Sequence, residues 1–243
     1  MNKKILRYEI KRIVFSKMFI VTFMLALAYS LIDLYINIVK GVSGTAPFSQ
    51  WSYCKFLCDI NTILLLIVML FCTDLFSKQE SMVKEITLFT SIPYRKVLAT
   101  KCLAIFISYS IVTLSCILTS LIFYKTTFNF TNFQNFILPI LIILIPTFIF
   151  IFSATIYLGS KKQILIYIFI PIVMFFSFFS FYTIPLFDIF AKGYITNAPK
   201  IAEIDITGEP IFSLSLSFII SRFSLILLGI FLYIITFCRK LSK

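Results

Sequence analysis

The chain has no histidine and only six glycines in 243 residues. Histidine is the commonest side-chain ligand of protein-bound zinc and a frequent ligand of haem iron, so either site would lack its usual ligand here. No segment matches the G-x-x-x-x-G-K-[ST] loop that cradles nucleotide phosphates, and the H-E-x-x-H and G-x-S-x-G catalytic motifs are also missing. We therefore expect that the chain is not an enzyme and that it binds no metal or organic cofactor itself.

Acidic residues are scarce as well: ten Asp and Glu stand against 22 Lys and Arg, a formal net charge of +12. A surplus of this size can mark a nucleic-acid-binding protein, but here the cations follow another pattern. Sixteen of the 22 lie in residues 3–17, 78–101, 161–162 and 239–243. Apolar runs separate these segments, and an excess of Lys and Arg marks the cytoplasmic side of a membrane protein. We expect both termini in the cytoplasm and no nucleic-acid partner.

Long apolar runs occupy most of the chain, 60% of whose residues are hydrophobic. The six runs are residues 18–39, 56–76, 102–124, 136–158, 164–187 and 211–237. About 20 apolar residues in a helix cross the ~30 Å hydrocarbon core, and a helix pairs its own backbone groups inside lipid. The sequence predicts one all-α integral membrane domain with six transmembrane helices. The longest outer connection is then residues 188–210. The 30 phenylalanines, with many Ile, Lys, Asn and Tyr, are typical of AT-rich genomes, and we expect a bacterial cytoplasmic membrane.

Residues 1–17 precede the first run and are too polar to insert into lipid. On a helix, the apolar side chains fall on one half of the circumference, and the cations, Lys11 and Arg12 among them, fall on the other. This pattern is typical of a helix that lies in the membrane interface with its cations towards anionic headgroups. Glu9 interrupts the apolar half, so we expect a specific partner for it, such as a neighbouring cation.

The connection 77–101 is cytoplasmic in this topology, too charged to be embedded, and much longer than a turn. Apolar residues at helical spacing predict a short helix that ends at Pro93. A helix of this size can dock on a partner, with apolar side chains in a groove and charged ones at the rim. The side chains that we expect at this contact are Ile86, Leu88, Phe89, Glu80, Glu85 and Arg95.

Charged residues inside the predicted spans are few, and such residues are costly in lipid and are functional candidates. Arg222 lies deep in the last run, and Asp33 and Asp59 are the acids at comparable depth. We expect an ion pair between Arg222 and one of these acids, which would tie the last span to the first or second. A proton-coupled site built from the same charges is the alternative.

The order of the parts resembles the permease subunits of type-2 ABC exporters, a group that includes drug, polysaccharide, bacteriocin and lantibiotic-immunity transporters. Residues 8–17 are similar to the acidic-then-basic segment before that family's first span. Residues 80–101, with Pro93 followed by Arg95, are similar to its coupling loop. The Gly-Thr pair common inside that loop is replaced here by the Lys-Glu pair at residues 84–85. The resemblance covers essentially the whole chain.

This resemblance implies a division of labour between polypeptides. Residues 77–101 would form the coupling helix, seated in a groove of a separate cytoplasmic ATPase that binds ATP and Mg. Two six-span subunits, identical or homologous, would face each other around the route of a hydrophobic or amphipathic cargo such as a peptide, an antibiotic or a lipid-like molecule. The alternative function is a small channel or secondary transporter that uses the intramembrane charges Asp33, Asp59 and Arg222.

Overall fold

The structure is a computed structural model that describes residues 3–41, 45–77, 80, 94–179, 187–204 and 210–239. These residues form helices and connections, with no strand beyond an isolated bridge between Ile204 and Pro210. The helices are α1 (Lys3–Val14), α2 (Lys17–Leu34), the π-helix η1 (Tyr35–Val39), α3 (Gln50–Leu75), α5 (Tyr94–Phe128), α6 (Gln134–Lys161), α7 (Ile164–Phe178), α8 (Lys192–Ile201) and α9 (Leu216–Arg239).

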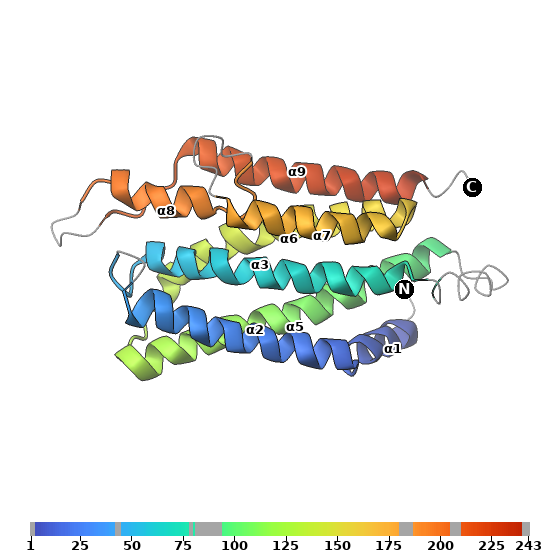
Figure 1. Cartoon of the computed structure of the whole chain (residues 1–243), viewed down its shortest axis with the longest axis horizontal. Coiled ribbons are helices and arrows are strands. Elements are labelled where there is room, and N and C mark those ends of the chain that lie inside the picture. Colours follow the sequence, from blue (N-terminus) through green and yellow to red (C-terminus); the bar gives the residue numbers. More distant parts are fainter. Residues whose placement is uncertain are drawn as a thin grey trace.

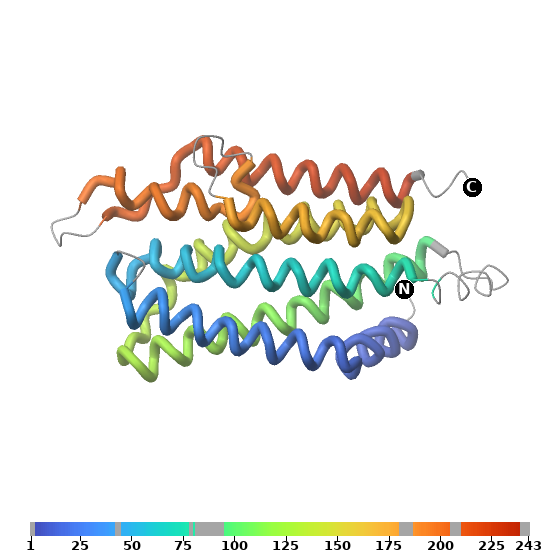
Figure 2. Tube along the Cα trace, in the orientation of Figure 1, coloured from blue at the N-terminus to red at the C-terminus, as the bar shows by residue number. Residues whose placement is uncertain are grey.

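The long helices lie side by side in an elongated bundle, as Figures 1 and 2 show. The short helix α1 is at one end, where α9 also ends, and α8 is at the opposite end (Figure 1). The central element is α3, which packs against α2, α5, α6, α7 and α8. Its side chains are apolar around most of its circumference and most of them are buried, as expected for a helix surrounded by other helices.

Among the residues that the structure describes, five helices are long and apolar enough to cross a membrane: Lys17–Val39, Gln50–Leu75, Arg95–Phe128, Gln134–Lys161 and Leu216–Cys238. The predicted all-α, multi-pass membrane architecture is therefore confirmed in this coarser form. The expected run 164–187 is represented by α7, which has 15 residues. At 1.5 Å per residue it is about 22 Å long, short of the ~30 Å hydrocarbon core. Residues 180–186 lie outside the described part of the chain.

Two helices begin earlier than the apolar runs indicated. Residues 95–101 belong to α5 and not to the connection, so Lys101 is held on a helix. In the same way α3 begins at Gln50, after Ser49 whose hydroxyl accepts a hydrogen bond from the backbone N–H of Ser52 at 3.1 Å. Serine at this position supplies an acceptor for a backbone donor that the first turn leaves free, and this allows a helix to begin before its apolar run.

A second serine cap separates α1 from α2. Ser16 has extended backbone angles, φ −72° and ψ 145°, and its hydroxyl accepts a hydrogen bond from the N–H of Phe19 at 3.1 Å. The chain bends at this residue, so α1 does not continue the axis of α2 but packs against α5. The cap thereby brings the polar side chains of α1 to the first turns of α5.

The backbones of α6 and α9 approach each other closely at Gly229. A Cβ atom at this position would lie 2.8 Å from both the carbonyl oxygen and the side chain of Ile149. Small residues at helix crossings permit such contact in membrane proteins, where van der Waals packing supplies much of the association energy. This crossing holds α9, and with it Arg222, in a fixed position against the bundle.

Candidate functional site

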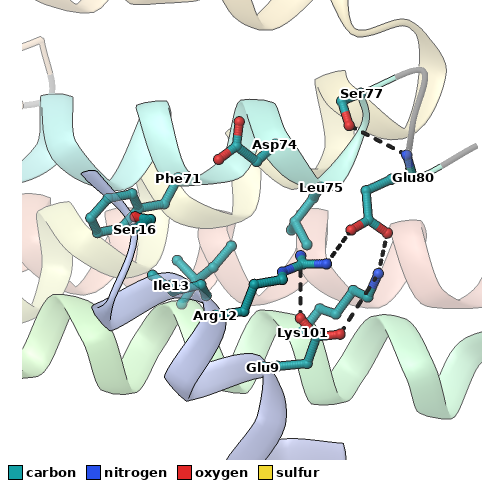
Figure 3. A pocket seen from close by; sticks show the side chains of 11 residues that line it. Glu9, Arg12, Ile13, Ser16, Phe71, Asp74, Leu75, Ser77, Glu80 and Lys101 are labelled. Atoms are coloured by element: carbon teal, nitrogen blue, oxygen red, sulfur yellow. Dashed lines mark hydrogen bonds and ion pairs between the residues drawn. The ribbon is translucent and has the colours of Figure 1, made fainter. Parts of the chain in front are cut away.

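Four charged side chains meet where α1 packs against the beginning of α5, and we call Glu9, Arg12, Glu80 and Lys101 the α1 cluster. Arg12 Nη1 donates to Glu80 Oε1 at 2.6 Å, and its Nη2 lies 3.2 Å from Glu9 Oε2. Lys101 Nζ donates to Glu80 Oε2 and lies 4.0 Å from Glu9 Oε1. Figure 3 shows the four side chains pointing toward one another, so that each acid contacts both cations. The predicted cationic partner of Glu9 is confirmed.

The α1 cluster is buried enough for its charges to depend on one another. Glu9 is 6% exposed and Lys101 8%, and a charge taken out of water to this extent is tolerated only when it is paired. Burial alone would raise the pKa of Glu80, but hydrogen bonds from Lys101 and Arg12 outweigh it and lower that pKa. Burial alone would lower the pKa of Arg12, and the hydrogen bond to Glu80 and the charge of Glu9 raise it instead.

A cavity of about 330 Å³ adjoins the α1 cluster. Its apolar wall includes Phe71 and Leu75 of α3 and Ile105 of α5, and Asp74 also lines it (Figure 3). The side chains of the described residues therefore leave space at the junction of α1, α3 and α5, although protein interiors are usually close-packed. Space of this kind lets α1 shift against α3 without compressing a packed core.

The residues predicted to contact a partner ATPase fall into two groups. Glu85, Ile86, Leu88, Phe89 and Pro93 lie outside the described residues, so their role stays a prediction.

Glu80 and Arg95 are described, and both have partners within the chain. The Glu80 side chain is only 12% exposed and is held by the α1 cluster, so it is not placed as a rim charge for another protein. Arg95 Nη2 donates to the carbonyl oxygen of Cys238, near the end of α9, at 3.4 Å. Of the predicted α1 cations, Lys11 is exposed while Arg12 joins the cluster.

A second group of polar side chains lies at the opposite end of the bundle, and we call Asp188, Tyr194 and Arg222 the α8 cluster. Asp188 Oδ2 accepts a hydrogen bond from the backbone N–H of Tyr194 at 2.8 Å, near the start of α8. Burial is the main cause that raises the pKa of Asp188, although this hydrogen bond and the charge of Arg222 oppose it. Tyr194 Oη accepts from the N–H of Ser215, which joins α8 to the segment before α9.

The predicted ion pair of Arg222 with Asp33 or Asp59 is wrong. The guanidinium, on a residue that is 3% exposed, donates to the backbone carbonyl of Ile189 at 2.8 Å and to that of Asp188. It also lies 4.7 Å from the centre of the Phe218 ring. Asp59 instead pairs with Lys192 of α8 at 3.0 Å, because α8 folds back over α3. The sequence did not single out Asp188, Tyr194 or Lys192 as site residues. Their only signal in the sequence is that an acid, Asp188, stands shortly before a short helix.

Asp33 lies on the inner face of α2 and is 8% exposed. Its Oδ1 accepts a hydrogen bond from Asn37 Nδ2 at 2.8 Å, and its Oδ2 has no hydrogen-bond partner among the described residues. In the part of the chain that the structure describes, no three His, Cys, Asp or Glu side chains gather into a group that could hold a metal ion.

Comparisons of the chain with protein-family models, with curated proteins and with solved structures found no match.

Proposed function

We propose that this chain is the membrane-spanning subunit of an ATP-driven exporter of the type-2 ABC class, working with a separate cytoplasmic ATPase. In this proposal α7 and the residues after it complete a sixth crossing, and both termini lie in the cytoplasm of a bacterial cell. The cargo is a hydrophobic or amphipathic molecule. A second permease subunit, identical or homologous, forms the other wall of its route.

The observation that carries the proposal is the connection of Glu80 to two helices. Glu80 lies just beyond the end of α3, at the beginning of the segment proposed to contact the ATPase. Its carboxylate is held by Arg12 of α1 and Lys101 of α5. A displacement of this segment is therefore passed to α1 and α5 together through charge-assisted hydrogen bonds, which are stronger than neutral ones. A connection that merely joined two spans would not need such an attachment.

The outward faces of α2 and α9 fit a subunit in lipid. Met24 and Leu25 on α2 are each 61% exposed, and Leu227 on α9 is 67% exposed. In water such apolar faces would be a liability, but they suit lipid tails or the apolar face of a second permease subunit.

Copurification from the native host tests the proposal. A tagged chain, extracted from its host's membranes in mild detergent, should retain an ATP-binding protein with ATPase activity. Joint replacement of Glu85 and Phe89 by alanine should release this partner while membrane insertion is unchanged. Lys200→Ala is the matched control, because Lys200 is exposed on α8 at the other end of the bundle. Wild-type transport and full ATPase retention in the double variant would contradict the proposal.

The proposed sidedness has a separate test. Five of the six native cysteines are buried and Cys238 is exposed, so Cys238→Ser supplies a background of low thiol reactivity. In that background, Lys84→Cys should react with an impermeant maleimide only after the membrane is opened, and Lys200→Cys should react in intact cells. Labelling of both positions from the same side would rule out the topology.

A further inference from the structure

Two polar side chains of α2 lie one turn apart on the face of this helix that packs against α3. Phe19 of α2 stacks on Phe71 of α3, with ring centroids 5.9 Å apart, and this contact shows which face of α2 points to α3. Ser30 and Asp33 are eleven and fourteen residues after Phe19, which is about three and four turns of helix, so both lie on the same side of α2 as Phe19.

These side chains are buried and incompletely hydrogen-bonded. Ser30 is fully buried and Asp33 is 8% exposed. Ser30 Oγ and Asp33 Oδ2 have no hydrogen-bond partner among the residues that the structure describes. A buried polar atom without a partner is uncommon in proteins. For a carboxylate oxygen, which carries part of a negative charge, the cost is larger than for a neutral group.

From this arrangement we propose that Asp33 is a proton-binding site, occupied at neutral pH, inside the membrane-spanning bundle. The Asn37 amide donates to Oδ1, and Oδ2 is buried with no donor among the described residues. A buried carboxylate is stable only when its charge is paired or fully hydrogen-bonded, and otherwise it becomes neutral by taking up a proton. A proton on Oδ2 removes this charge, while Oδ1 keeps its hydrogen bond from Asn37. Asn37 belongs to the π-helix η1, which begins two residues after Asp33.

The charges around Asp33 favour the neutral acid over a bound metal cation. Lys192 is a cation that could neutralise an ionised Asp33, and it is already paired with Asp59 at 3.0 Å. Lys55 of α3 and Tyr29 of α2 are further ionisable groups on this side. Between the lysines at its two ends, α5 contributes as titratable residues only Cys102, Tyr109, Cys116 and Tyr124. An ionised Asp33 inside lipid would carry a large desolvation penalty, and a proton removes the charge itself.

The site also has a consequence for α8. Loss of the proton would create a second carboxylate that competes with Asp59 for Lys192, the first residue of α8. Protonation of Asp33 therefore favours the observed position of α8, in which Lys192 contacts Asp59 alone. Neither an ATPase nor a cargo takes part in this protonation.

Infrared difference spectroscopy of the purified full chain in lipid nanodiscs tests the proposal. At neutral pH the wild type should show a carboxylic-acid C=O band that shifts in D₂O and is lost completely in Asp33→Asn. Asn is isosteric with the neutral acid, so this variant should keep the wild-type elution profile. The matched control is Glu203→Gln, which removes an exposed carboxylate and should leave the band unchanged. Absence of the band in the wild type, or its loss in Glu203→Gln instead, would overturn the proposal.

A second measurement on the wild-type chain decides the question if Asp33→Asn does not fold. Dicyclohexylcarbodiimide reacts with protonated carboxyl groups in apolar surroundings, and peptide mapping by mass spectrometry locates the adduct. We expect the adduct on Asp33, in a yield that falls as the pH is raised. An unmodified Asp33 under conditions that modify other carboxyl groups of the chain would overturn the assignment.

Discussion

The α1 cluster and the α8 cluster hold charged side chains at opposite ends of the bundle, but by different means (Figure 1). In the α1 cluster two acids and two cations bind one another through their side chains alone. In the α8 cluster Arg222 binds two backbone carbonyls, and Asp188 accepts a backbone N–H. The α1 cluster therefore links separate elements through side-chain contacts. The α8 cluster instead fixes the path of the main chain, because its charges bind backbone groups.

This difference predicts which end can move. The α1 cluster can open at Arg12, because this side chain is 40% exposed and water can replace it while Lys101 still holds Glu80. A cavity beside it leaves room for displacement. The α8 cluster cannot open without withdrawing donors from buried carbonyls, which leaves polar groups without partners. We therefore expect the α1 end to be the moving end of the molecule and the α8 end to be the fixed one.

The largest effect is expected for Arg222→Ala. Removal of the guanidinium leaves the carbonyls of Asp188 and Ile189 without their donor, and two hydrogen bonds from a charged group are worth about 3 kcal/mol or more. Thermal unfolding in detergent and the yield of monodisperse protein should both fall markedly. Phe223→Ala is the matched control, because the neighbouring Phe223 is 62% exposed on the outer face of α9. Equal losses for the two variants would remove the distinction between the clusters.

Arg222→Lys sharpens the same test. A lysine ammonium has no planar fork with which to reach two carbonyls at once, and it loses the stacked contact with Phe218. We expect less than half of the lost stability to return. Full rescue by lysine would mean that the positive charge matters and the hydrogen-bond geometry does not.

A smaller effect is expected in the α1 cluster. In a double-mutant cycle of Arg12→Gln and Glu80→Gln, the coupling free energy should be about 1 kcal/mol, typical of a partly exposed ion pair within a network. This coupling should weaken in high salt, because salt screens charges that water can reach. A coupling as large as the loss in Arg222→Ala, and insensitive to salt, would show that both ends are equally rigid.

The two clusters should also respond to pH with opposite signs. The pKa of Glu80 is lowered from its ordinary 4.5, so its contribution to stability is present above pH 4.5 and is lost as the pH falls through the lowered pKa. The pKa of Asp188 is raised from 3.8, so its contribution is present below pH 3.8 and is lost as the pH rises through the raised pKa. Unfolding midpoints against pH for the wild type, Glu80→Gln and Asp188→Asn should separate the two. Parallel curves for all three proteins would contradict this assignment.

The bundle could be predicted from the sequence because each long apolar run has one stable form in lipid, the helix. Glu9 could be interpreted for a similar reason: an acid on an apolar helix face needs a cation, and Arg12 is one turn away. The surroundings of Trp51 and Tyr53 could not be predicted in this way. Their residue types are typical of a headgroup belt, yet both are at most 2% exposed, because α3 begins at Gln50 and is enclosed by other helices.

The partners of Arg222 could not be predicted because they are not side chains. The depth of Arg222 in its span pointed to two acids as partners, Asp33 and Asp59. Matching charged side chains by depth cannot find backbone carbonyls, because these carry no net charge. Only the folded path of residues 187–191, which turns through a positive φ of 64° at Ala191 into α8, presents those carbonyls to α9. The same turn brings Lys192 to Asp59 and so occupies one of the two acids that Arg222 was expected to bind.

The smallest effect tests whether charge alone stabilises the α8 end. Asp59 and Lys192 form a simple side-chain ion pair there, with side chains 25% and 22% exposed, and such a pair contributes about 0.5 kcal/mol. Lys192→Gln should therefore lower the unfolding midpoint only slightly, far less than Arg222→Ala. Lys200→Gln, an exposed cation of the same helix, controls for the loss of one positive charge. A loss in Lys192→Gln that approaches that of Arg222→Ala would mean that α8 is held by its charges, as α1 is, and that the two ends do not differ in kind.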